Sequence, residues 1–82
     1  MTKFSIPSKI EAIDEAVSRT TAFATESGFG DEALFGIDMA VREAVANAVK
    51  HGNKLDESRN VEIELTGTEA ALEIVIRDFG EG

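Results

Sequence analysis

One stretch decides the fold of this chain: Met39-Ala40-Val41-Arg42-Glu43-Ala44-Val45-Ala46-Asn47-Ala48-Val49-Lys50-His51-Gly52. Alanine and valine fill most of it. Glu43, Asn47 and His51 recur every four residues, and this spacing places them along one stripe of a helix with 3.6 residues per turn. An asparagine in mid-helix is locally unfavourable, because its amide competes for backbone partners. The presence of Asn47 in this helix therefore requires a functional explanation.

The composition is that of one small globular domain. The 82 residues are 43% hydrophobic and 29% charged, and a domain of this size buries roughly two-thirds of the surface that its unfolded chain exposes. No apolar run approaches the ~20 residues of a membrane helix, and residues 1–8 lack the apolar core of a signal peptide. We therefore expect a cytoplasmic protein that does not enter a membrane.

Cysteine and charge exclude several kinds of site. The chain has no cysteine and a single histidine, which excludes disulfides, zinc sites built on thiolates and sites with several histidines. Its formal net charge of −8 would repel a phosphate backbone, so direct nucleic-acid binding is not expected. A protein partner, or an anion bridged by a metal ion, fits better.

Two helices are predicted between residues 8 and 52. Ser8 and Glu11 have the spacing of a capping box, which predicts a helix from Ser8 through about Glu26, with Gly28 just beyond its end. Asp31 is expected to cap a second helix that Gly52 ends. The expected buried positions are Ile10, Ile13, Val17 and Ala24 in the first helix, with Thr20 at the margin, and Leu34, Ile37, Val41, Ala44, Val45 and Ala48 in the second. The opposite side of the second helix carries Gly36, Ala40, Glu43, Asn47 and Lys50, as if something approached it closely.

Three strands are predicted around these helices. Phe4-Ser5-Ile6 alternates and stops at Pro7, and residues 61–66 and 72–77 each alternate between apolar and polar side chains. A loop near Gly67-Thr68-Glu69 would join the last two strands as a hairpin. Helices and strands in one small chain indicate a fold of the α+β class.

The individual motifs are weak when taken alone. Polar residues spaced like Glu43, Asn47 and His51 are common on solvated helix faces. Asp78-Phe79-Gly80 matches the metal-binding triplet of protein kinases, but the chain has no glycine-rich loop, strand lysine or catalytic-loop motif to accompany it. Gly80 and Gly82 indicate backbone bends or the close approach of a ligand.

The combination is more specific. A helix with E-x-x-x-N-A-x-x-H-G, a polar loop, a hairpin and D-x-G-x-G resembles the N box and first glycine box of the gyrase, heat-shock chaperone, histidine kinase and MutL (GHKL) ATPase superfamily. Residues 42–52 and 75–82 are most similar to the anti-sigma-factor serine kinases. The resemblance implies that residues 1–82 form a single, partial histidine-kinase-like ATPase domain with a Bergerat-type fold. This fold is an α+β two-layer sandwich with helices on one face of a mainly antiparallel sheet, and here it would be incomplete at its C-terminal edge.

This resemblance implies roles for individual residues. Asn47 would bind Mg²⁺ through its amide oxygen, and Glu43 would be the general base that takes a proton from an attacking serine hydroxyl or water. Asp78 would accept a hydrogen bond from the adenine amino group, while Gly80 and Gly82 would let the backbone pass close to the nucleotide.

Lys50 and His51 have two possible roles each, and a third residue, Arg19, has one. Lys50 would reach a phosphate or be a solvated lysine at the helix end, and His51 would flank the adenosine or only complete the helix. Arg19 resembles a position that these proteins use to hold a partner, on a segment that matches the family in pattern only.

The implied function is that of an ATP-dependent serine kinase that sequesters a sigma factor and phosphorylates an anti-anti-sigma protein. Homodimers would form through Phe4–Ile6. Because the family continues past the first glycine box into a lid over the phosphates, the 82-residue chain itself is expected to be weakly active or inactive. The alternatives are a binding module without catalysis and a fragment of a histidine-kinase catalytic domain.

Overall fold

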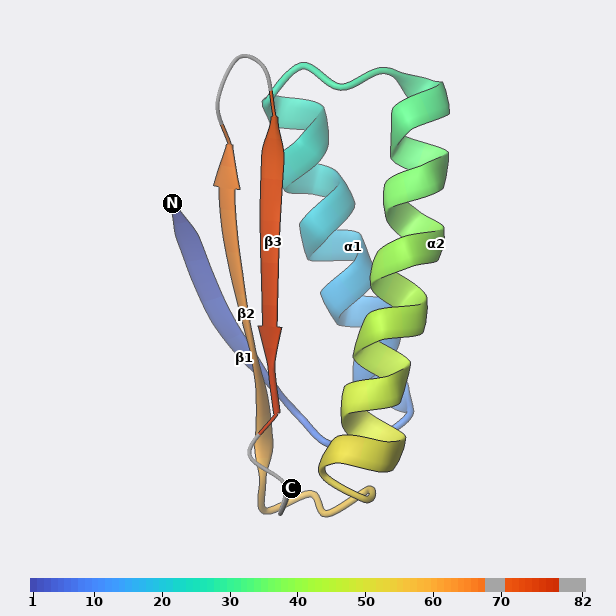
Figure 1. The fold of residues 1–82 in the computed structure, drawn as a ribbon, viewed down its shortest axis with the longest axis vertical. Helices are drawn as coiled ribbons and strands as arrows, with labels where there is room; N and C mark the ends of the chain where they lie inside the picture. The colour runs from blue at the N-terminus through green and yellow to red at the C-terminus, as the bar shows by residue number, and fades with distance from the viewer. Residues whose placement is uncertain (68–70, 79–82) are drawn as a thin grey trace.

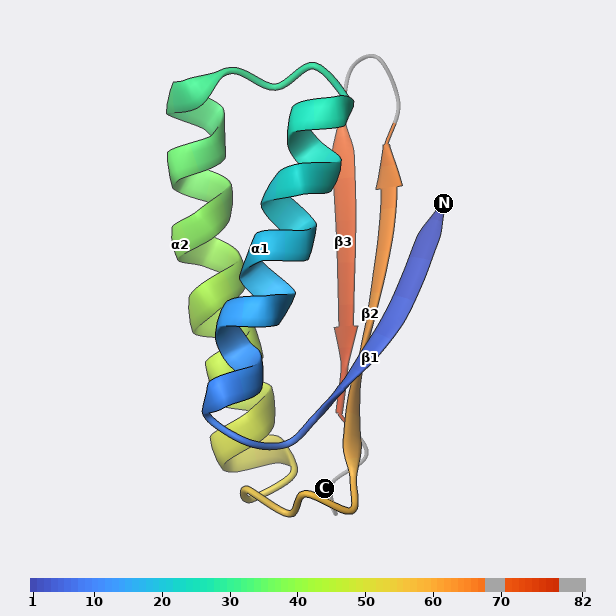
Figure 2. The same cartoon turned by 180° about the vertical axis from the view of Figure 1, so that it is seen from behind.

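The computed structural model describes residues 1–67 and 71–78 of the chain. Its elements follow in the order β1 (Thr2–Pro7), α1 (Glu11–Glu26), α2 (Asp31–Asn47), a π-helical turn η1 (Ala48–Gly52), β2 (Asn60–Gly67) and β3 (Leu72–Arg77). Figures 1 and 2 show from opposite sides that α1 and α2 lie next to each other over one face of the sheet. The predicted α+β two-layer arrangement is confirmed.

Among the described residues, the sheet has three antiparallel strands in the order β1-β2-β3. Phe4 lies opposite Ile63, and Leu65 lies opposite Ile74. Side chains alternate between the two faces of a strand, so this register places most of the apolar residues of the three strands on the helix side. Val75, which lies opposite Glu64, is on the other face. The predicted hairpin is confirmed by the pairing of β2 with β3, although residues 68–70 of its loop lie outside the described residues.

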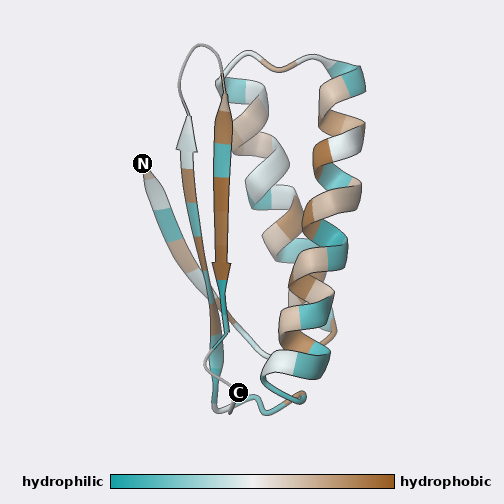
Figure 3. Ribbon diagram, in the orientation of Figure 1, coloured by the Kyte–Doolittle hydropathy of each residue, from teal (hydrophilic) through white to brown (hydrophobic). Residues whose placement is uncertain are grey.

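The core lies between the sheet and the two helices. Its buried side chains are Ile6, Ala12, Ile13, Ala16, Val17, Val41, Val45, Ala48, Val49, Val61, Ile63 and Leu65. Strand β2 contributes three fully buried residues because it is the central strand. In Figure 3 most of β3 is coloured as hydrophobic, yet its residues are only half-buried or exposed. In the described part of the chain, β3 is thus an edge strand, and it is less covered than the central strand β2.

The outer face of the sheet is polar. The Lys3 ammonium lies 3.4 Å from the Glu62 carboxylate and 3.6 Å from that of Glu64, and the Arg77 guanidinium lies 3.8 Å from Glu62. These pairs leave one face of β2 in contact with charge and water while the other face is fully buried. No helix in residues 1–67 and 71–78 is long and apolar enough to cross a membrane.

The predicted start of the first helix is wrong. Helix α1 begins at Glu11, not Ser8, and no side chain caps it. The Ser8 hydroxyl instead donates a hydrogen bond to the Arg59 carbonyl oxygen at 2.6 Å, so it does not serve as the helix cap. Ile10, which precedes the helix, is 48% exposed and not part of the core. Gly28, with φ of +95°, follows α1 as predicted, because this left-handed conformation favours glycine.

The second helix differs from the prediction in its cap and in three of the six positions expected to be buried: Leu34 and Ile37 are only half-buried, and Ala44 is exposed. Gly30 is the N-cap residue and Asp31 is already helical, without a capping hydrogen bond from its side chain. Ala44 is exposed, whereas Val49 is completely buried. The residues that face the sheet therefore form a narrower stripe than the sequence pattern indicated.

Candidate functional site

The exposed side of α2 and η1 carries the predicted polar stripe. Glu43, Asn47, Lys50 and His51 are all exposed, as are Gly36 and Ala40 nearer the start of the helix. Val41, Val45, Ala48 and Val49 hold the opposite side in the core. The apolar periodicity thus turns the polar residues outward, where they are accessible to a ligand.

The helix does not end regularly. Residues Ala48–Gly52 form a π-helical turn, in which the Asn53 backbone N–H donates to the Ala48 carbonyl oxygen at 2.8 Å, five residues back. The sequence predicted an ordinary helix end at Gly52. Single π turns occur mostly within helices and often at functional sites, because they redirect the side chains that they carry. Here the turn carries Lys50 and His51.

Asp78 lies beside Gly52. A Cβ atom built on Gly52 would lie 2.9 Å from the Asp78 Cβ and closer still to its carboxyl group. Asp78 can therefore lie at this position only because Gly52 has no side chain. Strand β3 ends at Arg77, so the aspartate that follows the sheet meets the end of the polar helix.

Arg42 fixes α2 against α1 next to this stripe. Its guanidinium donates from Nη1 to Asp14 Oδ1 at 2.6 Å and from Nε to Asp38 Oδ1 at 3.4 Å. The hydrogen bonds to Asp14 and then to Asp38 raise the pKa of Arg42 above its ordinary value. The stretch from Met39 onward thus contains, besides the predicted site residues, a side chain that ties the two helices together.

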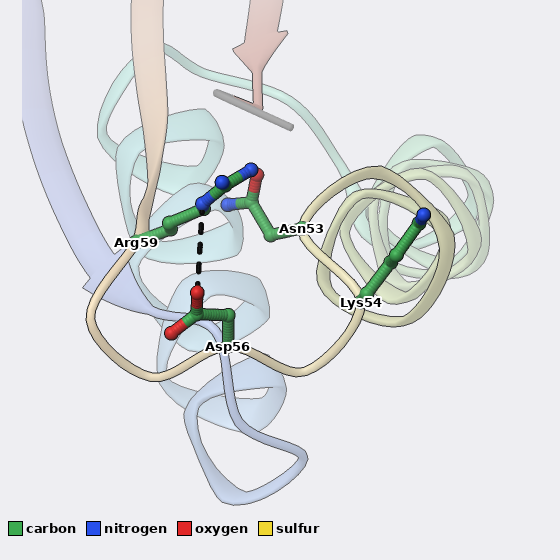
Figure 4. A pocket seen from close by; sticks show the side chains of 4 residues that line it. All are labelled: Asn53, Lys54, Asp56 and Arg59. Atoms are coloured by element: carbon green, nitrogen blue, oxygen red, sulfur yellow. Dashed lines mark ion pairs between the residues drawn. The ribbon is translucent and has the colours of Figure 1, made fainter. Parts of the chain in front are cut away.

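Sequence reasoning missed a buried junction below the site. Asn53 is only 1% exposed; its side-chain amide donates to the Ser8 hydroxyl oxygen at 2.8 Å and to the Asn60 carbonyl oxygen at 3.0 Å. Figure 4 shows the pocket beside it, lined by Asn53, Lys54, Asp56 and Arg59. Asp56 and Arg59 point toward each other across this pocket, with 3.5 Å between Oδ2 and Nε.

The predicted site residues are therefore placed as follows. The end of the stripe and Asp78 are brought together at Gly52, and Glu43 and Asn47 lie further back on the exposed side of α2. Gly80 and Gly82 lie outside the described residues. Among the described residues, no three His, Cys, Asp or Glu side chains are grouped as metal ligands.

The chain has a two-layer α+β fold, and its polar helix ends next to Asp78, the residue that follows β3. This arrangement is expected of a GHKL-type ATPase domain. The chain belongs to the family described as the histidine kinase-like ATPase domain, whose model matches residues 6–82.

Among the proteins of known name that the chain resembles are serine-protein kinases and an anti-sigma factor. The chain is 32% identical to the serine-protein kinase RsbW of Listeria monocytogenes over 75 residues, which are 92% of this chain and 48% of that protein. It is 33% identical to RsbW of Oceanobacillus iheyensis over 79 residues, 96% of this chain and 50% of that protein. The anti-sigma F factor of Clostridium perfringens is 45% identical over 51 residues, 62% of this chain and 36% of that protein. The chain spans about half the length of the curated relatives that it matches.

Proposed function

We propose that this chain carries the nucleotide-binding part of an ATP-dependent serine kinase that acts as an anti-sigma factor. The contact between Asp78 and Gly52 is the main structural support, because it joins the two motifs that such a site needs. The names of the relatives, a serine-protein kinase and an anti-sigma factor, support the same reading.

The residues present fit a magnesium nucleotide. Mg²⁺ is usually held by one or two protein oxygen ligands and by the phosphates of its nucleotide, so a cluster of carboxylates is not required. Asn47 offers an amide oxygen on the exposed side of α2, and Lys50 offers a cation on the following turn. When bound, Mg²⁺ would neutralise negative charge on the phosphates.

We assign the remaining roles from the position of each residue relative to Asn47. Glu43 lies one turn before Asn47 on the same exposed side and would take the proton of an attacking serine hydroxyl. Asp78 would accept from the adenine amino group, with His51 beside the adenosine. Gly80 and Gly82 would give the nucleotide close access to the backbone.

Nucleotide binding is tested by calorimetric titration with ATP and Mg²⁺. Asn47→Ala and Asp78→Asn should each weaken binding about tenfold or more, since a hydrogen bond to a charged or desolvated group contributes about 1.5–3 kcal/mol. Glu15→Ala and Glu73→Gln, exposed residues outside the stripe, are the matched controls. Equal heats from all five proteins would refute the nucleotide site and favour a pure binding module.

Catalysis requires a different assay. We would join the chain in register to the C-terminal half of the Listeria monocytogenes relative and supply an anti-anti-sigma protein as phosphate acceptor. Glu43→Gln should keep ATP affinity within twofold and lose serine phosphorylation, whereas Glu32→Gln, on the first turn of the same helix, should keep both. Unchanged phosphorylation in the Glu43 variant would overturn its assignment as the base.

The proposed partners are a sigma factor, an anti-anti-sigma protein and a second copy of the chain. Strand β1 has a partner strand on one side only among the described residues, so its other edge could pair with a second protomer. The Arg19 guanidinium lies 4.9 Å from the centre of the Phe4 ring. The proposed dimer edge and the proposed partner-holding arginine therefore share one region of the surface.

A further inference from the structure

We infer that Asn53 is a positioning residue of the nucleotide site and that it acts together with Ser8. The inference rests on the proposed nucleotide-binding function, and it assigns to the buried junction a role that neither sequence motif includes. Asn53 directly follows Gly52, the residue against which Asp78 lies.

The side chain of Asn53 joins three parts of the chain. Its Nδ2 donates to Ser8 Oγ at 2.8 Å and to the Asn60 carbonyl oxygen at 3.0 Å. Ser8 Oγ in turn donates to the Arg59 carbonyl oxygen at 2.6 Å. Ser8 follows β1, and Asn60 begins β2, so these hydrogen bonds fix the end of the helix to two adjacent strands of the sheet.

The backbone around Asn53 shapes the turn that carries the ligand-facing residues. The Asn53 N–H closes the π turn on Ala48, and the Leu55 N–H donates to the Val49 carbonyl oxygen at 2.8 Å. Lys54 and Leu55 have φ of 52° and 60°, in the left-handed region that non-glycine residues rarely adopt. The chain thus changes direction sharply immediately after Asn53. The positions of Lys50 and His51 on the π turn therefore depend on the hydrogen bonds that hold Asn53.

Burial alone does not explain an asparagine here. A small domain gains more stability from a buried apolar side chain than from an amide, which must recover its lost hydration through hydrogen bonds. Hydrogen bonds, unlike apolar contacts, fix direction as well as distance. Asn53 and Ser8, both buried, therefore hold the π turn in one orientation, with Gly52 against Asp78 and Lys50 beside the proposed phosphate position.

The test compares Asn53→Ala and Ser8→Ala with Val17→Ala, a buried change in α1 outside the junction. All are measured in the 82-residue chain at a temperature at which each is folded, with Mg-ATP as the probe. Asn53→Ala should weaken Mg-ATP binding about tenfold and move the amide NMR signals of Lys50, His51 and Asp78. Ser8→Ala should act in the same direction, and the double variant should lose less than the two single losses combined, because both act through one network. Val17→Ala should leave affinity within twofold and those three signals in place.

The outcomes separate this inference from the function on which it rests. If the wild-type chain does not bind Mg-ATP, the proposed function fails and the positioning role fails with it. If the wild type binds and Asn53→Ala binds equally well, or if Val17→Ala loses as much affinity, only the positioning role is refuted. Should Asn53→Ala not fold, Ser8→Ala decides by the same criteria.

Discussion

At the scale of single residues, Gly52 is the most sensitive point of the proposed site. Gly52→Ala would place a Cβ 2.9 Å from the Asp78 Cβ, so Asp78 must move. We expect Mg-ATP affinity to fall about tenfold, the equivalent of about 1.4 kcal/mol, measured by calorimetry. The φ of Gly52 lies outside the left-handed region, so backbone strain does not confound the result.

Gly36→Ala is the matched control for Gly52→Ala. Gly36 lies within α2, and a Cβ there would meet nothing within 4 Å. Replacing a helical glycine by alanine should raise the free energy of unfolding by about 0.5–1 kcal/mol, measured by urea denaturation, without changing nucleotide affinity. Equal losses of affinity in the two variants would show that the Asp78 contact is not the cause.

Local sequence rules succeeded where the partners were local. The stripe of Glu43, Asn47 and Lys50 could be predicted because the helical period alone turns these residues outward. Asn53 and Ser8 could not be predicted as partners, because they are 45 residues apart in sequence and meet only in the folded chain. The capping-box prediction failed for the same reason, because the hydroxyl of Ser8 donates a hydrogen bond to the Arg59 carbonyl oxygen, 51 residues away in sequence.

At the scale of elements, the loop between η1 and β2 contains a testable carboxylate. Hydrogen bonds from the hydroxyl and the backbone N–H of Ser58 lower the pKa of Asp56 below its ordinary value of 3.8, with a smaller contribution from Arg59. A lowered pKa in the folded state stabilises the fold above the unfolded pKa, and this stabilisation is lost as pH falls through the folded pKa. Ser58→Ala should raise the pKa of Asp56, followed by NMR titration of its carboxyl carbon. An unchanged pKa would contradict the hydrogen-bond origin of the shift.

The junction of α2 and η1 gives a second prediction at this scale. Val49 is completely buried whereas Ala44 is exposed. Val49→Ala should therefore lower the free energy of unfolding by about 2 kcal/mol, through lost burial and the cavity that remains. Ala44→Ser should change it by less than about 0.5 kcal/mol. Urea denaturation of both variants checks the face of the helix that the sequence pattern assigned incorrectly.

At the scale of the whole molecule, the layers could be predicted from the apolar residues. Those that alternate in the strands and those that recur with the helical period are buried in one common core. The π turn and the left-handed backbone at Lys54 and Leu55 could not be predicted, because they lie next to Asn53, whose partners Ser8 and Asn60 are distant from the helix pattern in sequence. The same distinction applies to β3: its alternation predicted a strand, but only the folded chain shows that Ile74 and Ile76 remain partly exposed.

The edge formed by β1 gives the last prediction, on association. A lysine on an edge strand disfavours pairing with another edge, and Ser5 is exposed and lies opposite Glu62. Ser5→Lys should therefore leave the protomer folded and shift the proposed β1-mediated dimer toward monomer, measured by sedimentation over a range of concentrations. Glu73→Gln raises the net charge by the same amount on β3, so it separates the effect of the edge from that of charge. Dissociation in both variants, or in neither, would place the interface elsewhere than on β1.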